Sequence, residues 1–150
     1  MPRVEREATV VWEGSSAKGR GELSATSSGA FTALPFTEPA RVGAPEGMTS
    51  PEELLAAAHG GCFGMSLAAE LTRARTPPQR LDVRVTIVLD EVEGQGHRIV
   101  ESQLDVRARA AGSDEQTFAA AVAAADAGCP FSNLIAASAT VTIDARLEES

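Results

Sequence analysis

Two cysteines carry the most distinctive chemistry in this 150-residue chain. Cys62 lies in the segment TSPEELLAAAHGGCF (residues 49–63), and Cys129 lies in AGCPFSNL (residues 127–134). Two distant thiols that form no CxxC motif are more often packed core side chains than a redox pair. A redox role would need one cysteine that reacts as a thiolate and a second cysteine that traps the oxidised sulfur.

A long helix is expected to position the first of these cysteines. Ser50 can act as its N-cap, Pro51 is allowed at the first helical position, and Glu53 lies where a capping-box carboxylate belongs. The helix should run to about Arg75, because a Thr-Pro-Pro sequence follows. Most of its circumference is apolar, which predicts a central position covered on several sides. Cys62 lies too far from its N-terminus for the helix dipole to stabilise a thiolate, so a cationic side chain would be needed.

Alternating patterns and capping residues predict the other elements. Extended segments are expected at Ala8–Trp12, Glu22–Ser24, Ala30–Thr32, residues 81–90, residues 100–108 and residues 141–147, with a loop at Arg41–Ser50. A second helix should run from a Ser113 cap to about Ala127, and a short one from Cys129-Pro130 through Ala136. This order of strands and helices indicates an α+β fold, which we expect to form one domain over residues 1–150.

Charge and hydropathy restrict the partners. The net charge of −8 argues against nucleic acid and anionic lipid. The uncharged stretch 54–69 is too short for a membrane span, contains His59 and Ser66, and has glutamates at both ends, so a buried core helix is expected. Residues 1–11 lack the apolar core of a signal peptide, and we therefore expect a cytoplasmic protein.

The two cysteine segments and an early VWEG (residues 11–14) together resemble the OsmC/Ohr family of organic hydroperoxide reductases. The order and spacing of these motifs extend the resemblance from Trp12 to the final strand. His59 and the VWEG segment look like the OsmC branch, whereas the CPFSN segment looks like the Ohr branch, so both placements stay open. The resemblance implies antiparallel β-sheets around long central helices in an intertwined homodimer.

The resemblance also implies a reaction. Cys62 would be the thiolate that a hydroperoxide oxidises to a sulfenic acid, and Cys129 would condense with it to a disulfide. An external dithiol, such as a dihydrolipoyl protein, would reduce that disulfide, and no cofactor or metal would be required. The natural hydroperoxide and the physiological reductant stay open. The alternative is a non-catalytic homodimer of the same fold that binds a hydrophobic ligand or partner while both cysteines stay idle.

An arginine before the long helix, held by the glutamate that follows the helix-opening proline, is a further implication of the resemblance. Glu52 matches that glutamate, Arg41 is our choice for the arginine, and Arg20 is the alternative. Glu52 and Cys62 are ten residues apart on one helix, which separates them by roughly 15 Å. They can therefore share a site only through a second chain or a long bridging arginine, as the implied homodimer would allow.

His59 precedes Cys62 by three residues and shares its helical face. It could tune the thiol or line a substrate pocket, but a satisfied core histidine is slightly favoured. A zinc site formed by Cys62, Cys129, His59 and His97 has the right number of ligands. We disfavour it because the spacing matches no usual structural zinc pattern.

Overall fold

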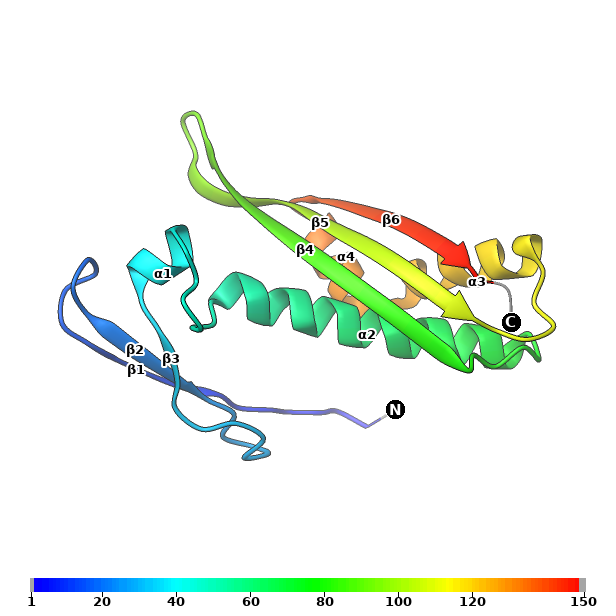
Figure 1. The fold of residues 1–150 in the computed structure, drawn as a ribbon, viewed down its shortest axis with the longest axis horizontal. Helices are drawn as coiled ribbons and strands as arrows, with labels where there is room; N and C mark the ends of the chain where they lie inside the picture. The colour runs from blue at the N-terminus through cyan, green and yellow to red at the C-terminus, as the bar shows by residue number, and fades with distance from the viewer. Residues whose placement is uncertain (1, 149–150) are drawn as a thin grey trace. The chain divides into compact units, whose positions relative to one another are not determined.

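The computed structural model describes residues 2–148 (Figure 1). The chain divides into two compact units, Met1–Pro51 and Glu52–Ser150. The expected single domain over residues 1–150 stays a prediction. The elements in chain order are β1 (Thr9–Glu13), β2 (Arg20–Ser24), β3 (Leu34–Phe36), α1 (Glu38–Val42), α2 (Pro51–Arg73), β4 (Arg80–Val92), β5 (Gly96–Arg109), α3 (Glu115–Gly128), α4 (Pro130–Ala136) and β6 (Thr140–Leu147). The α+β fold with a long helix is confirmed.

The first unit is an antiparallel sheet in the order β1-β2-β3, followed by the short helix α1. Gly21 of β2 pairs with Trp12 on one side and Phe36 on the other. The two aromatic rings lie 5.4 Å apart between centroids, and a Cβ atom at Gly21 would overlap both. The glycine therefore leaves room for the aromatic pair that covers this part of the sheet.

Two expectations for the first unit are wrong. The third strand lies at Leu34–Phe36, not at Ala30–Thr32. Arg41 belongs to a helix, not to a loop, because Thr37 caps α1 by accepting a hydrogen bond from the backbone of Ala40.

The second unit is built on a sheet in the order β4-β5-β6, in which β4 and β5 are antiparallel and β6 runs parallel to β5. The three strand positions agree with the sequence prediction. Leu104, Val106 and Ala108 of β5 point into a core that also contains Phe63 of α2 and Phe118 of α3. Helices therefore cover one face of the sheet, whereas its other face carries charged and polar side chains.

The helix α2 buries only one of its faces within the chain. His59, Phe63, Leu67 and Leu71 recur every fourth residue and are buried, whereas Met65 is 73% exposed. Ala57, Gly61 and Ala69 lie on the same exposed face as Met65. By length and composition alone, α2 could cross a membrane, as could α3 and α4 together. The buried row on α2 agrees instead with the expected core helix, although the chain covers less of it than the sequence predicts.

The ends of the two long helices follow local rules. Arg75 adopts a positive φ of 63°, and the backbone N–H of Thr76 donates to the Leu71 carbonyl at 2.9 Å. This arrangement is a Schellman motif with arginine in the position that glycine usually occupies. The cap of α3 is Asp114, which accepts from the Thr117 backbone at 2.7 Å, so the expected Ser113 cap is wrong by one residue.

Candidate functional site

The structure brings the two cysteines together. The Cys129 thiol donates a hydrogen bond to the Cys62 sulfur, with 3.2 Å between the two sulfur atoms. Neither cysteine forms a disulfide. Cys62 is half-buried on α2, and Cys129 is fully buried at the junction of α3 and α4. A disulfide requires about 2.05 Å between the sulfurs, so bond formation needs an approach of only about 1 Å.

The junction between α3 and α4 fixes the position of Cys129. Its backbone is extended, with φ of −82° and ψ of 114°, and Pro130 starts α4 immediately afterwards. The Cys129 sulfur acts as the N-cap of α4 and accepts from the Ser132 backbone N–H at 3.4 Å. A side chain that caps a helix has few rotamers open to it, so this sulfur is held toward α2.

The surroundings of Cys62 favour the neutral thiol. Burial raises the pKa of Cys62, and the hydrogen bond with Cys129 raises it further. The Phe131 backbone N–H and the Ser66 hydroxyl act in the opposite direction by bonding to the Cys62 sulfur. A thiol with a raised pKa is a poor nucleophile near neutral pH, so a reactive Cys62 requires a nearby positively charged group that stabilises its thiolate. Neither Ser66 nor Phe131 was identified from the sequence, because hydroxyl and backbone donors carry no distinctive motif.

The other predicted site residues lie in α1, β2 and the first turn of α2. Their proximity to Cys62 stays a prediction. Arg41 in α1 and Arg20 at the start of β2 belong to the first unit, whereas the cysteines belong to the second. Arg41 contributes to a hollow of about 360 Å³, which is also lined by Trp12, Ser16, Phe36, Thr37, Glu38 and Pro51. Glu52 lies in the first turn of α2, at the end of the helix far from Cys62.

His59 is completely buried and bonded on both sides of its ring. Its Nδ1 lies 2.7 Å from the Ser102 hydroxyl oxygen, and its Nε2 lies 2.7 Å from that of Ser132. Burial lowers the pKa of His59, while the Asp126 carboxylate partly opposes this effect. The favoured interpretation, a satisfied core histidine, agrees with this geometry. The two serines were missed because their meeting depends on tertiary structure alone.

No cluster of three or more His, Cys, Asp or Glu side chains suited to a metal ion occurs among residues 2–148. His97 is exposed near the start of β5, and both ring nitrogens of His59 are engaged by serines. The arrangement around the cysteines is therefore that of a pair of thiols with hydrogen-bond donors around them.

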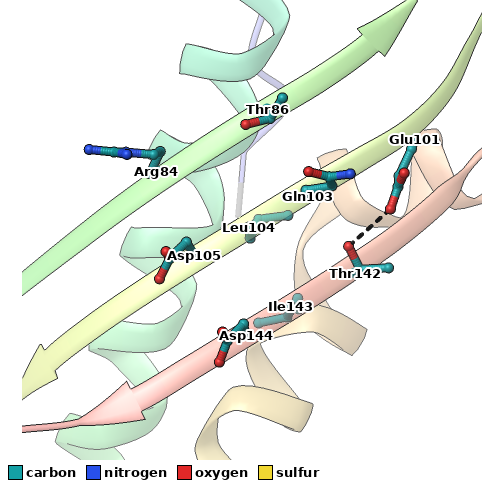
Figure 2. A pocket seen from close by; sticks show the side chains of 9 residues that line it. All are labelled: Arg84, Thr86, Glu101, Gln103, Leu104, Asp105, Thr142, Ile143 and Asp144. Atoms are coloured by element: carbon teal, nitrogen blue, oxygen red, sulfur yellow. Dashed lines mark hydrogen bonds between the residues drawn. The ribbon is translucent and has the colours of Figure 1, made fainter.

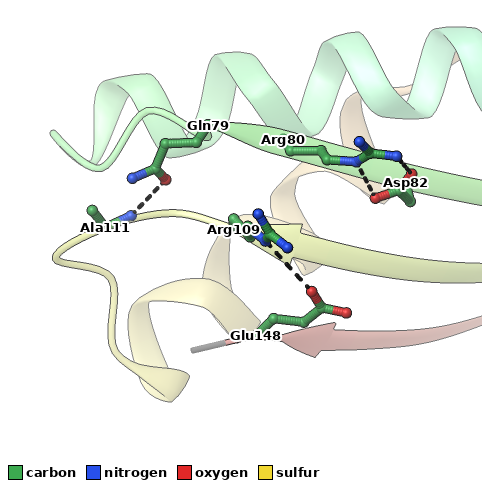
Figure 3. Close-up of polar contacts among 6 residues, drawn as sticks. All are labelled: Gln79, Arg80, Asp82, Arg109, Ala111 and Glu148. Atoms are coloured by element: carbon green, nitrogen blue, oxygen red, sulfur yellow. Dashed lines mark hydrogen bonds and ion pairs between the residues drawn. The ribbon is translucent and has the colours of Figure 1, made fainter. Parts of the chain in front are cut away.

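The polar face of the β4-β5-β6 sheet has two further hollows. One of about 400 Å³ is lined by residues of all three strands, with Thr142 donating to Glu101 at 3.4 Å (Figure 2). The other is lined by Val83 and by charged residues of β4 and β5. Near the end of the sheet, Arg80 pairs with Asp82 and Arg109 with Glu148 (Figure 3). These exposed, mixed-charge contacts contribute little energy each and include no predicted site residue.

Comparisons with known proteins agree with the fold. A family model described as OsmC-like protein matches residues 44–144. Peroxiredoxin OsmC of Escherichia coli (strain K12) is 33% identical over 145 residues, which cover 97% of this chain and 98% of that protein. The organic hydroperoxide resistance protein OhrB of Bacillus subtilis has a TM-score of 0.69 at 21% identity, covering 93% of this chain and 98% of that one. The OsmC like protein from Mycoplasma pneumoniae has a TM-score of 0.77 at 11% identity, covering 97% and 99%. The two structural likenesses show a shared fold.

Proposed function

The chain belongs to the OsmC family, and we propose that it reduces organic hydroperoxides to alcohols through Cys62 and Cys129. It is an enzyme of the peroxiredoxin-like type, as its curated relative is named. The Sγ–Sγ separation of 3.2 Å carries the proposal, because two free thiols at this distance can form a disulfide without rearrangement of the core.

The proposed reaction has two chemical steps before reduction. The Cys62 thiolate attacks the terminal oxygen of the hydroperoxide, so an S–O bond forms and the O–O bond breaks. The hydroxyl group stays on the sulfur as sulfenic acid, and the alkoxide takes a proton from solvent and leaves as the alcohol. Cys129 then attacks the resulting sulfenic acid, so the S–S bond forms while the S–O bond breaks and water leaves. An external dithiol restores both thiols by exchange, which completes one turnover.

We propose that Arg41 stabilises the Cys62 thiolate and that Glu52 holds Arg41 in place. Burial and Cys129 raise the pKa of Cys62, so a guanidinium close to the sulfur would favour the thiolate. Glu52 and Cys62 lie ten residues apart on α2, roughly 15 Å along the helix. Glu52 therefore cannot contact the Cys62 of its own helix, and we propose that a second copy of the chain or a bridging Arg41 completes the site.

A homodimer also accounts for the exposed face of α2. Met65, 73% exposed, lies there among the small residues Ala57, Gly61 and Ala69, which would let another helix approach closely. Covering this face in a dimer would complete the central position that the apolar sequence of the helix predicts. The cytoplasmic location expected from the sequence stays a prediction.

A peroxide-consumption assay tests the proposed function. With cumene hydroperoxide and dithiothreitol, the wild type should turn over, and Cys62→Ser should reduce the rate to that of the dithiol alone. Ser113→Ala, which alters a half-buried residue outside the site, serves as the matched control and should retain activity. Undiminished turnover in Cys62→Ser would refute the assignment, and no turnover in the wild type would favour the idle ligand-binding homodimer.

A further inference from the structure

His59 joins three elements of the second unit through its two ring nitrogens. It lies on α2, its Nδ1 contacts Ser102 of β5, and its Nε2 contacts Ser132 of α4, each at 2.7 Å. A neutral imidazole has one donor and one acceptor nitrogen, so both can be satisfied by the two hydroxyl groups. Both nitrogens are engaged by serines and the residue is 0% exposed, so the ring neither lines a pocket nor bonds to a sulfur.

Ser132 is bound in two directions. Its hydroxyl contacts His59 at 2.7 Å, and its backbone N–H donates to the Cys129 sulfur at 3.4 Å. His59 lies one helical turn before Cys62 on α2. The His59–Ser132 contact therefore ties the start of α4, together with the sulfur it holds, to the stretch of α2 that carries Cys62.

Disulfide formation depends on this placement. A sulfenic acid on Cys62 has two fates, attack by Cys129 or further oxidation to sulfinic acid by a second hydroperoxide. The two sulfurs must approach from 3.2 Å to about 2.05 Å for the first fate. A misplacement of about 1 Å can slow a step of this kind by about 100-fold. The His59–Ser132 contact, which fixes α4, should therefore affect the ratio of disulfide formation to over-oxidation.

We propose that His59, through its hydrogen bond to Ser132, is a positioning residue for formation of the Cys62–Cys129 disulfide. The proposal rests on the proposed function and refines its second step. In that step the Cys129 sulfur bonds to the Cys62 sulfur, the S–O bond of the sulfenic acid breaks, and the hydroxide leaves as water with the thiol proton of Cys129. His59 takes no proton from either sulfur, and it holds the helix from which Cys129 attacks.

Two pairs of variants separate positioning from general core stability. Ser132→Ala removes the hydroxyl but keeps the backbone N–H that donates to the Cys129 sulfur. Ser102→Ala removes the equivalent hydrogen bond on the β5 side. In the second pair, the side-chain amide of His59→Gln extends about as far as Nε2 and can bond to Ser132. The shorter amide of His59→Asn extends only about as far as Nδ1 and can bond to Ser102.

The measurement is the fraction of Cys62 converted to sulfinic acid per turnover, by mass spectrometry, at a fixed excess of cumene hydroperoxide with dithiothreitol. The single-turnover rate of sulfenic acid formation is the internal reference. Ser132→Ala and His59→Asn should raise the sulfinic fraction about 10-fold or more, with the reference rate unchanged. Ser102→Ala and His59→Gln should stay within about 3-fold of the wild type.

Two results would overturn the inference. An unchanged sulfinic fraction in Ser132→Ala would do so, and so would an equal rise in both serine variants, because His59 would then be a core group only. The serine pair decides the matter even where a histidine variant fails to fold. If the wild type itself forms no Cys62–Cys129 disulfide, the proposed function fails. If the wild type forms it and all four variants match it, only this inference fails.

Discussion

The sulfurs of Cys62 and Cys129 lie 3.2 Å apart as free thiols, although 67 residues separate them in the sequence. The chain between them forms the β4-β5 hairpin and α3, which return Cys129 to the middle of α2. Phe63 and Phe118 pack in the same core, so the packing of α2 and α3 against one face of the sheet sets this separation. The pair is therefore a product of the fold as a whole.

Oxidation by one equivalent of hydroperoxide should convert both thiols into one intramolecular disulfide. The sulfurs are already within about 1 Å of bonding distance, so no large movement is needed. A non-reducing peptide map should show a Cys62–Cys129 cross-link. In Cys129→Ser, Cys62 should stop at sulfenic acid, react with dimedone and over-oxidise with excess peroxide. Normal dithiol-dependent turnover of Cys129→Ser, or disulfides between two copies of Cys62, would contradict the resolving role.

Arg41→Ala should raise the pKa of Cys62 and slow its reaction with cumene hydroperoxide by about 10-fold or more. Burial and Cys129 already raise this pKa, so loss of a stabilising cation should leave the thiol protonated near neutral pH. Thiolate absorbance against pH measures the first effect, and stopped-flow kinetics the second. Arg20→Ala is the matched control, and a larger effect in that variant would transfer the role to Arg20.

The elements that were predictable are those with a sustained pattern. Residues 81–90 alternate so regularly that β4 was found within two residues at each end. The third strand was missed because it contains Pro35, which argues against a strand unless that strand lies at a sheet edge, as β3 does. Ser113 and Asp114 are both good capping residues, and only the structure shows that Asp114 makes the bond.

The site was predictable in part for a different reason. Cys62 and Cys129 stand in distinctive local motifs, so each could be chosen from the sequence. Ser102 lies in a strand of ordinary alternation, and nothing nearby shows that it meets His59. A contact between residues 43 positions apart depends on how β5 and α2 pack, which one sequence does not display.

The protein should be a dimer of about twice 15.6 kDa by light scattering. We expect Met65→Glu to weaken it, because Met65 is 73% exposed on the face of α2 that the chain leaves uncovered, and burying a charge there is costly. Ala123→Glu, at an exposed position on α3, is the control and should leave the mass unchanged. A monomeric wild type with full peroxidase activity would refute the dimeric site.

The stability of the protein should decrease as the pH falls below about 6.5, and His59 should account for part of the decrease. Burial lowers the pKa of His59 in the folded chain, so between that value and about 6.5 the unfolded chain binds more protons. The free energy of unfolding therefore rises with pH across this window, and the contribution of His59 is complete above it. The negative charge of Asp126 partly offsets the effect of burial on the pKa of His59, so the pH range over which stability changes is narrower. The pKa is still lowered, and stability still rises with pH in that range.

Urea unfolding of the wild type and of His59→Gln, measured at intervals from about pH 5 to pH 8, isolates this contribution. The glutamine does not titrate, so the difference in unfolding free energy between the two proteins should shrink as the pH falls. Asp82 and Asp114, whose pKa values are lowered by their hydrogen bonds, lose their contributions only at more acidic pH and occur in both proteins. A difference that stays constant over the range would mean that His59 keeps its ordinary pKa in the fold. The burial and the two serine contacts would then not hold the ring neutral.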